Sequence, residues 1–348
     1  MKLYKKARFI FILITFSSLR FLSLPVFAIT AICQAKGYEI SLVYNKELQS
    51  GDPIFILAQY NFSSNFLSNT NIPSIPKCIE GKGELIDKES QKQIRMGNLF
   101  AVKTPNSKIC TVACMIPTSA YLEPKDYDLK VTYTINGKKE SSFILPITCN
   151  YKDFIQEDIP LDAKNTGIKQ DSSSTRMAQI KKLNTVLGTA DFDSYKKSTF
   201  SSFSEPLVCN RRTSFFGDRR KFIYTDGKSS TGLHYGIDYG VKTGTDVHAC
   251  SKGKVVLAEN RISTGYSICI EHMPGLYSLY YHLDSMAVKT GEKVKEGQFI
   301  GKSGCTGLAT GPHLHWEIRL NMEAVNPDWF VQYFTKTFLQ ETETFLHQ

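Results

Sequence analysis

The sequence predicts a mainly β protein that has an N-terminal β-sandwich and a second, mostly antiparallel β-sheet domain. Short runs of alternating apolar residues, separated by turn residues, fill residues 37–150, and glycine-rich strand patterns resume from Ser204 onward. The length of 348 residues favours two domains. A single hydrophobic core usually stops growing at roughly 250–300 residues.

Residues 1–28 have the pattern of a secretory signal peptide. A basic start is followed by the apolar run Phe9–Phe16, and the segment ends at Val26-Phe27-Ala28. A retained membrane anchor is the alternative, but Arg20 interrupts the apolar stretch before it reaches the roughly 18–20 residues that a spanning helix needs. We therefore expect an exported protein, which contacts a membrane only if this segment is retained.

The formal net charge of +9 gives little support for nucleic-acid binding. Five basic residues and no acidic residue lie within residues 1–28, so loss of this segment would lower the charge to +4. A nucleic-acid partner is not expected from this balance.

Nine cysteines, all beyond residue 32, suit an oxidising compartment, and the odd number leaves at least one of them unpaired. Cys110 and Cys114 have a spacing that could suit a metal ion. The N-terminal half after the signal contains no histidine to complete such a site. Disulfides or buried free thiols are therefore the better interpretation.

The N-terminal domain is expected to cover residues 29–150. Strands are predicted at Glu39–Tyr44 and Pro53–Tyr60, and a hairpin is predicted from Leu129–Ile135 through Asn136-Gly137 into Ser142–Ile147. The Asn-Gly pair fits a type I′ turn, in which both central residues have positive φ. Several such strands over about 110 residues are typical of an antiparallel β-sandwich.

A linker with a short helix is expected over residues 151–200. Its first part is polar and mixed, and Met177–Leu187 has apolar residues at helical spacing. The second domain is then expected at residues 201–335, followed by a C-terminal tail at residues 336–348.

The chemistry concentrates in this second domain, where six of the seven histidines lie between positions 234 and 315. In an extended strand, residues two or four apart project from the same face, so His234 can share a face with Asp238, and His313 with His315. Two imidazoles and a carboxylate suit zinc and leave a fourth coordination position open. Either pattern alone arises by chance, but a further histidine, His282, lies between them in the same glycine-rich β region.

The segment from about Phe216 to Trp329 resembles the LytM/lysostaphin-type zinc endopeptidases of peptidoglycan, whose fold is an antiparallel sheet with a duplicated hybrid motif. The matching stretches are His234-x-x-x-Asp238, Gly244-Thr245-x-Val247, Ala249-x-x-x-Gly253, Tyr280-x-His282-Leu283, Val288-x-x-Gly291-x-x-Val294-x-x-Gly297-x-x-Ile300-Gly301, Ser303-Gly304-x-Thr306-Gly307, Gly311-Pro312-His313-Leu314-His315-Trp316-Glu317 and Asn326-Pro327. The resemblance covers about a third of the chain. The N-terminal β region also resembles the domain that precedes this catalytic domain in some members.

The resemblance implies that His234, Asp238 and His315 bind one zinc ion per chain. The zinc would polarise the scissile carbonyl and lower the pKa of its bound water towards about 7. His313 would then be the general base, and His282 would hold the water or stabilise the tetrahedral intermediate, although the two roles could be exchanged or shared. The implied reaction is hydrolysis of a peptide bond in peptidoglycan cross-links or stem peptides, in the periplasm or cell envelope.

Other residues carry less information. His248 and His272 are interpreted as structural, and the terminal His347 as solvated. Some relatives have a tyrosine upstream of the first metal histidine that supports the developing oxyanion. The corresponding stretch here, Tyr224–Gly232, offers no residue that we can assign to that role.

Two other functions fit parts of this pattern. A catalytically silent regulator would keep the fold and bind cell-wall or envelope proteins, but it would be expected to lose some of the five metal and catalytic residues. A zinc-stabilised structural or wall-binding protein would explain three ligands without explaining His282 and His313. The sequence does not specify which bond is cut or what the N-terminal domain does.

Overall fold

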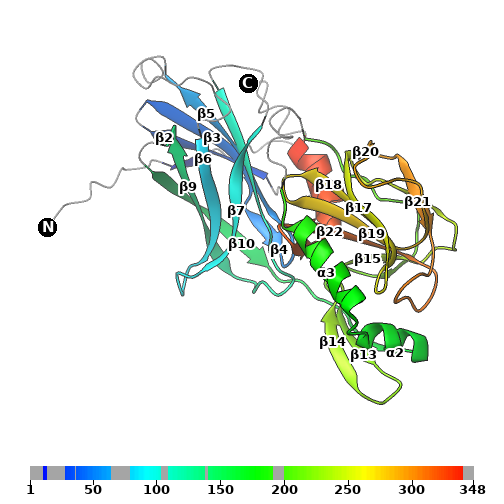
Figure 1. The fold of residues 1–348 in the computed structure, drawn as a ribbon. Coiled ribbons are helices and arrows are strands. Elements are labelled where there is room, and N and C mark those ends of the chain that lie inside the picture. Colours follow the sequence, from blue (N-terminus) through cyan, green and yellow to red (C-terminus); the bar gives the residue numbers. More distant parts are fainter. Residues whose placement is uncertain are drawn as a thin grey trace.

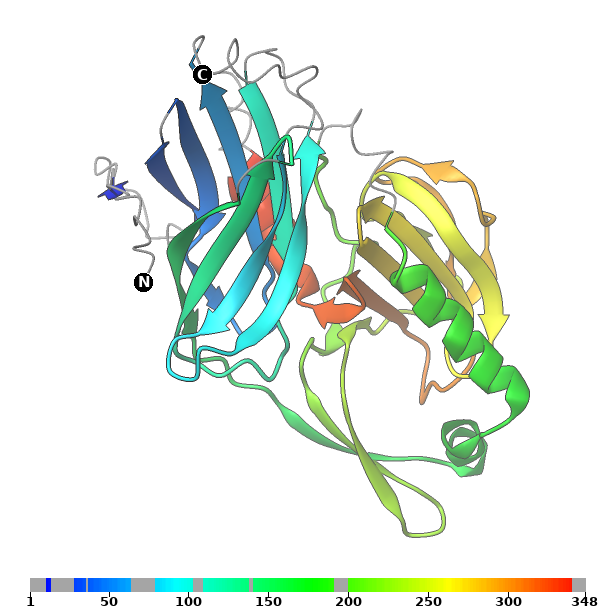
Figure 2. The same ribbon diagram turned by 60° about the vertical axis from the view of Figure 1, so that its left-hand side comes forward.

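The computed structural model describes residues 11–13, 28–35, 37–63, 79–102, 109–137, 140–190 and 200–339. The predicted signal peptide, residues 1–28, lies outside the described residues except for Phe11–Leu13 and Ala28. In these ranges, no helix has the length and apolar character needed to cross a membrane. Two β domains lie side by side (Figures 1 and 2), and the predicted mainly β fold is confirmed.

The N-terminal domain is the predicted β-sandwich. Its strand order is β1-β2-β3-β5-β8-β7-β6-β9-β10-β4. The strands are β1 (Phe11–Leu13), β2 (Ala28–Ala35), β3 (Tyr38–Asn45), β4 (Glu47–Gln49), β5 (Ile54–Phe62), β6 (Ile79–Asp87), β7 (Gln93–Val102), β8 (Ile109–Ile116), β9 (Asp126–Ile135) and β10 (Ser141–Asn150). Strand β7 pairs with β6 through its first half and with β8 through its second half, so it joins the two layers.

Alternation of apolar and polar residues explains how these strands pack. In β10, Phe143, Leu145, Ile147 and Cys149 are buried, whereas the residues between them are more exposed. Side chains of a strand point to opposite faces in turn, so this pattern places one face of β10 on the sandwich core. The predicted hairpin between β9 and β10 is confirmed, and both Asn136 and Gly137 have positive φ.

Several cysteines of this domain are buried thiols. Cys33, Cys114 and Cys149 lie in the sandwich core as free thiols. Burial raises the pKa of Cys33 and of Cys149 to about 11, and that of Cys114 to about 12, so all three thiols are protonated and unreactive near neutral pH.

The C-terminal domain is built on a second ten-stranded sheet, whose main path runs β12-β15-β22-β19-β18-β17-β20. The strands are β12 (Arg212–Ser214), β15 (Gly236–Tyr239), β16 (Asp246–His248), β17 (Gly253–Arg261), β18 (Gly265–Met273), β19 (Leu276–Met286), β20 (Lys293–Val294), β21 (Phe299–Ser303), β22 (Leu314–Leu320) and β23 (Glu323–Val325). All pairs in this sheet are antiparallel, and β15, β22 and β19 are neighbours.

A small three-stranded sheet projects beside this domain (Figure 2). It consists of β11 (Gln156–Pro160), β13 (Arg219–Ile223) and β14 (Ser229–Leu233), in that order. Strand β11 comes from the segment predicted as a linker, and it runs parallel to β13. The segment predicted as a linker therefore contributes a strand, β11, to the three-stranded sheet beside the second domain.

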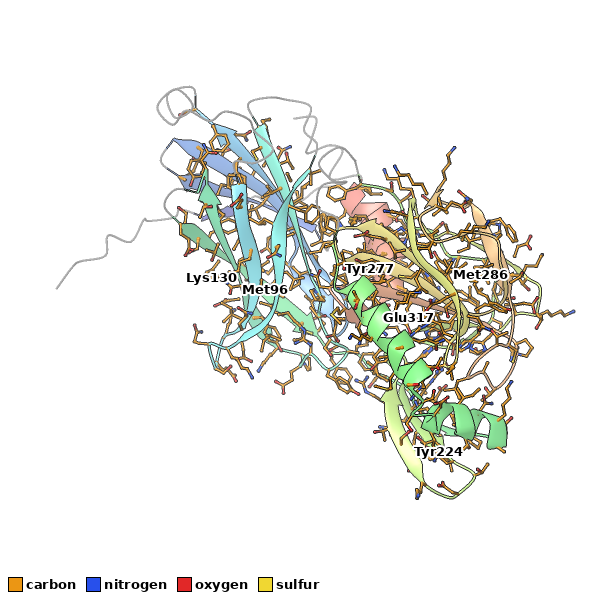
Figure 3. The ribbon with its side chains drawn as sticks, viewed as in Figure 1. Met96, Lys130, Tyr224, Tyr277, Met286 and Glu317 are labelled. Carbon is orange, nitrogen blue, oxygen red and sulfur yellow. The ribbon has the colours of Figure 1, made fainter. Side chains whose placement is uncertain are left out.

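Two helices follow β11, namely α2 (Ala163–Gln170) and α3 (Ser174–Leu187). Asp162 and Ser173 cap their N-termini by accepting hydrogen bonds from backbone N–H groups of the first turn. The helix predicted at Met177–Leu187 is confirmed as the main part of α3. It packs on the second sheet through Leu187, which lies in one apolar cluster with Tyr277 of β19 (Figure 3).

The two domains share an apolar interface. Helix α5 (Pro327–Trp329) continues into the π-helix η2 (Phe330–Phe338), which lies against β5 of the sandwich. The Phe55 ring contacts Phe334 and Phe338 edge to face, with ring centroids 5.3 and 5.1 Å apart, respectively. All three side chains are almost fully buried. Aromatic contacts of this kind stabilise a fixed arrangement of the domains.

We expect Phe55→Ala to lower the free energy of unfolding by about 3–5 kcal/mol, because it leaves a cavity among buried aromatic rings. Chemical denaturation would measure the loss. Phe299→Ala, which removes a side chain that is 40% exposed, is the matched control and should cost about 0.5 kcal/mol or less. Equal losses in the two variants would contradict the assigned interface.

Candidate metal centre

Strand pairing brings the predicted metal ligands together. Asp238 lies in β15 and His315 in β22, and the two residues are direct register partners in the antiparallel pair. His234 lies just before β15, and its backbone N–H donates to the carbonyl of Asp218. Because side chains of directly opposed residues lie on the same face of a sheet, Asp238 and His315 point to the same place. The connection between β14 and β15 brings His234 to them, so the three side chains converge on one point.

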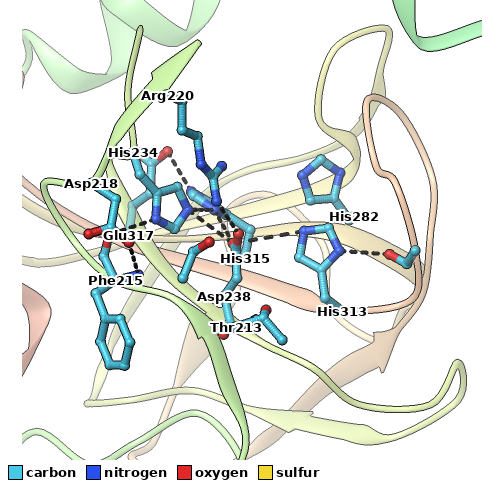
Figure 4. A network of polar contacts seen from close by, with 12 residues as sticks. Thr213, Phe215, Asp218, Arg220, His234, Asp238, His282, His313, His315 and Glu317 are labelled. Atoms are coloured by element: carbon cyan, nitrogen blue, oxygen red, sulfur yellow. Dashed lines mark hydrogen bonds and ion pairs between the residues drawn. The ribbon is translucent and has the colours of Figure 1, made fainter. Parts of the chain in front are cut away.

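The three donor atoms are close enough to share one ion (Figure 4). Oδ1 of Asp238 lies 2.7 Å from Nδ1 of His315 and 3.1 Å from Nε2 of His234, and the two nitrogens are 3.0 Å apart. The three residues are buried, and their ligand atoms all lie within 4.8 Å of one another. This set of two imidazoles and one carboxylate could hold a divalent metal ion.

The other nitrogen of each imidazole is held by a hydrogen bond. Nδ1–H of His234 donates to the carbonyl of Phe215 at 2.8 Å, and Nε2–H of His315 donates to Oε1 of Glu317 at 2.9 Å. The second oxygen of Glu317 accepts from Nε of Arg319 at 2.7 Å. These partners leave Nε2 of His234 and Nδ1 of His315 as the available metal donors, which is how metal-binding histidines are commonly oriented.

The two remaining predicted site residues lie beside this group. Nε2 of His313 is 3.8 Å from Oδ1 of Asp238, and the rings of His313 and His282 are 4.8 Å apart. Nδ1 of His313 donates to the carbonyl of Gly311, and Nδ1 of His282 donates to that of Thr306, both at 2.8 Å. Each ring therefore has its Nε2 free to act as a proton acceptor.

His282 occupies a strained position in the backbone. Its φ is +59°, a left-handed conformation that a non-glycine residue adopts at a cost of roughly 1 kcal/mol or more. Strand β19 pairs with β22 as far as Tyr281 and with β21 from Leu283 onward, so His282 lies where the strand changes partner. This local turn in β19 places the imidazole next to His313.

Burial and neighbouring charges determine the protonation of the site. Burial lowers the pKa of His313, and it lowers that of His282 to about 3, so both rings are neutral at pH 7. Burial opposes the charged form of His315, but the carboxylates of Asp238 and Glu317 prevail and raise its pKa to about 9. The imidazoles of His234 and His315 hold the pKa of Asp238 well below its usual range despite burial.

Comparison with known proteins connects this geometry to a family. The model of peptidase family M23 matches residues 232–327. The chain carries a peptidase M23 domain at its C-terminal end. This segment contains all five residues predicted for the site.

Named relatives match part of the chain. The DD-carboxypeptidase/endopeptidase Mpg of Neisseria meningitidis serogroup B is 40% identical over 123 residues, which are 35% of this chain and 27% of that protein. The peptidoglycan DD-endopeptidase ShyA of Vibrio cholerae serotype O1 is 41% identical over 93 residues, which are 27% of this chain and 22% of that protein. The chain thus spans about a quarter of the length of these relatives.

Among solved structures, the catalytic domain of the antimicrobial peptidase lysostaphin from Staphylococcus simulans is 32% identical. The alignment covers 38% of this chain and 90% of that domain, with a TM-score of 0.28. The family resemblance predicted from the sequence motifs is confirmed by the match of residues 232–327 to peptidase family M23.

An open groove of about 650 Å³ runs past the candidate metal centre and its two neighbouring histidines, which we call the M23 site (His234, Asp238, His282, His313 and His315). Asp238 and His313 line it, together with the loop Thr310–Pro312 and residues of β11 and β12. An extended chain could lie in such a groove with one of its peptide bonds beside the ligand group.

Several contacts of the M23 site were not predicted. Nη2 of Arg220 donates to Oδ2 of Asp238 at 2.8 Å, and Nε of Arg220 lies 3.4 Å from Oε2 of Glu157. Nothing in the local sequence indicates these partners, because they come from β13 and β11. Glu317 could have been found, since it lies two residues after His315 on the same strand face.

The other histidines lie outside the ligand group. His272 is buried and hydrogen-bonded to Ser278 Oγ at 2.7 Å and to the carbonyl of Lys252, and its pKa is lowered by burial to about 4. The His248 ring lies 6.2 Å from that of Phe299. Tyr224 is hydrogen-bonded to Ser230 in the β13–β14 hairpin (Figure 3), and His347 lies outside the described residues.

The raised pKa of His315 predicts that protons compete with the metal ion. Below about pH 9, the metal-free protein should carry a proton on Nδ1 of His315, and a metal ion must displace it. We expect the apparent metal affinity to fall by about tenfold per pH unit from about pH 9 to pH 7, with about one proton released per metal ion bound at pH 7. Isothermal titration calorimetry in buffers of different ionisation enthalpy would measure both quantities.

Glu317→Gln is the matched control for this experiment, because it removes one of the two carboxylates that raise the pKa of His315. The variant should release fewer protons at pH 7. Metal affinity that is independent of pH between 7 and 9 in the unsubstituted protein would contradict the assigned protonation.

Proposed function

We propose that this chain is an exported, zinc-dependent endopeptidase that hydrolyses peptide bonds in peptidoglycan cross-links or stem peptides. The observation that carries the proposal is the convergence of His234, Asp238 and His315 beside two neutral imidazoles. Two of these five residues, Asp238 and His313, line an open groove. Relatives named as peptidoglycan DD-endopeptidases support the substrate class. The signal-like N-terminal segment supports export to the periplasm or cell envelope.

In this proposal, three residues hold one zinc ion per chain. Nε2 of His234, Oδ1 of Asp238 and Nδ1 of His315 are the donors, since their partner atoms are bound by Phe215, Arg220 and Glu317, respectively. When bound, zinc supplies a Lewis acid that polarises the scissile carbonyl and makes water acidic. The hydrogen bonds of the three ligands preserve their orientation during turnover.

His313 is the proposed general base. Its pKa is lowered by burial, so the neutral ring can accept the proton of the attacking water, and its Nδ1 is already engaged by the Gly311 carbonyl. The proton therefore goes to Nε2, which lies on the side of Asp238. The same nitrogen then gives the proton to the leaving amine, as a general acid.

His282 is the proposed assistant to His313. Its neutral ring lies against that of His313, and its Nδ1 is held by the Thr306 carbonyl. Nε2 of His282 is thus available to accept a hydrogen bond from the attacking water, or to take its proton in place of His313. A fixed backbone kink at this residue favours such a role, because it keeps the imidazole in place without substrate.

Cleavage of isolated peptidoglycan sacculi tests the proposed function. Purified protein with zinc should release fragments with new peptide ends, detected by mass spectrometry, and a chelator should abolish the release until zinc is restored. Absence of cleavage by zinc-loaded protein over a range of pH values and wall types would favour the catalytically silent regulator instead.

Two substitutions test the division of roles within the site. We expect His315→Ala to lose zinc and activity together, because it removes a ligand. His313→Ala should retain zinc but lose turnover by about 10²–10⁴-fold, since only proton transfer is removed. Metal content by elemental analysis and turnover on the same substrate would be compared. Equal metal loss in both variants would contradict the assignment.

A further inference from the structure

The groove beside the M23 site contains two arginines in different environments. Arg220 forms ion pairs with two carboxylates of the protein: it donates to Asp238 and lies beside Glu157. Arg211 is exposed on the groove and forms no ion pair with any described residue. Asp158 also lines the groove and is exposed on β11, but it is not paired with Arg211.

Backbone pairing fixes where the Arg211 side chain begins. The N–H of Gly240 donates to the carbonyl of Arg211 at 3.0 Å, next to the pairing of β12 with β15. The guanidinium lies over Gly240, since a Cβ atom added there would be 3.1 Å from Nη1 and 3.3 Å from Cζ of Arg211. The absent side chain of Gly240 therefore makes room for this cation.

The position of Gly240 relates the cation to the reaction. Gly240 follows Asp238 by two residues and lies directly after the end of β15, which separates their Cα atoms by at most roughly 7 Å. A residue of an extended peptide spans roughly 3.3–3.6 Å. The guanidinium is therefore within reach of a group on the residue adjacent to a scissile bond held at the ligand group.

We propose that Arg211 is a specificity-determining residue that binds a free carboxylate on the leaving-side amino acid of the scissile bond. This inference rests on the proposed peptidase function. The carboxyl carbon of the acyl residue is itself the scissile carbonyl, so a free α-carboxylate next to the bond belongs to the leaving side. Guanidinium groups bind carboxylates through two parallel hydrogen bonds, which gives direction as well as charge.

The chemistry of this carboxylate defines the substrate class. Peptidoglycan carries it on diaminopimelate at a D-alanyl cross-link and on a terminal D-alanine. A glycine bridge lacks it, because the corresponding carboxyl group is part of the next peptide bond. Arg211 therefore favours cross-links and stem peptides whose leaving residue ends in a free acid, and disfavours continuous bridges.

Matched substrates test the inference. A cross-linked muropeptide dimer and a pentapeptide monomer are each prepared with the leaving-side carboxylate free and with the same group amidated. The unsubstituted protein should cleave the free acid with a kcat/KM about tenfold or more above that of the amide. Arg211→Met should reduce this ratio to about one, mainly by lowering kcat/KM for the free acid. Arg211→Lys should keep part of the preference.

An unchanged thermal unfolding midpoint checks that the Met variant is folded. The matched control is Lys254→Met, which removes an exposed cation on β17 and should leave the ratio as it is. Equal cleavage of acid and amide by the unsubstituted protein would overturn the inference and leave the peptidase function standing. Retention of the preference in Arg211→Met would also overturn it. Cleavage of none of the substrates would count against the peptidase function itself. Comparison of dimer with monomer distinguishes the cross-link from the terminal D-alanine as the source of the carboxylate.

Discussion

The buried carboxylate of Asp238 is the interaction on which the rest of the site depends. One of its oxygens faces His234 and His315, and the other accepts a hydrogen bond from Arg220. A buried carboxylate without such partners would be costly, so the surrounding cations and imidazoles must remain in place. This requirement fixes the relative positions of β13, β15 and β22, and with them the groove in which Arg211 and His313 lie.

The N-terminal domain supports this arrangement from a distance. The ring of Phe216 packs so closely on Gly51 that a Cβ atom there would lie 2.2 Å from it, and Gly51 also has a positive φ. The neighbouring residue Phe215 supplies the carbonyl that orients His234. Together with the aromatic contacts of Phe55, this packing links the sandwich to the segment that holds a proposed metal ligand. Side-chain packing therefore joins the two domains next to the segment that orients His234.

Much of the architecture follows from local patterns. The alternation in β10, the Asn136-Gly137 pair and the spacing of Met177–Leu187 each predicted an element that the structure contains. The first part of the segment predicted as a linker, residues 151–200, was less informative. Its polar composition indicated a linker, and its strand β11 forms because β13 offers a free edge to pair with. Composition alone cannot show such a partner.

The sequence by itself determined which donors the candidate site offers, because His234, Asp238, His313 and His315 are spaced by the two-residue period of a strand. The positions of His282, Arg220 and Arg211 relative to those donors were decided by the tertiary structure. His282 reaches the site through a change of strand partner. Arg220 reaches it from β13, and Arg211 from the position just before β12. These contacts join segments that are distant along the chain, and only long-range strand pairing brings such segments together.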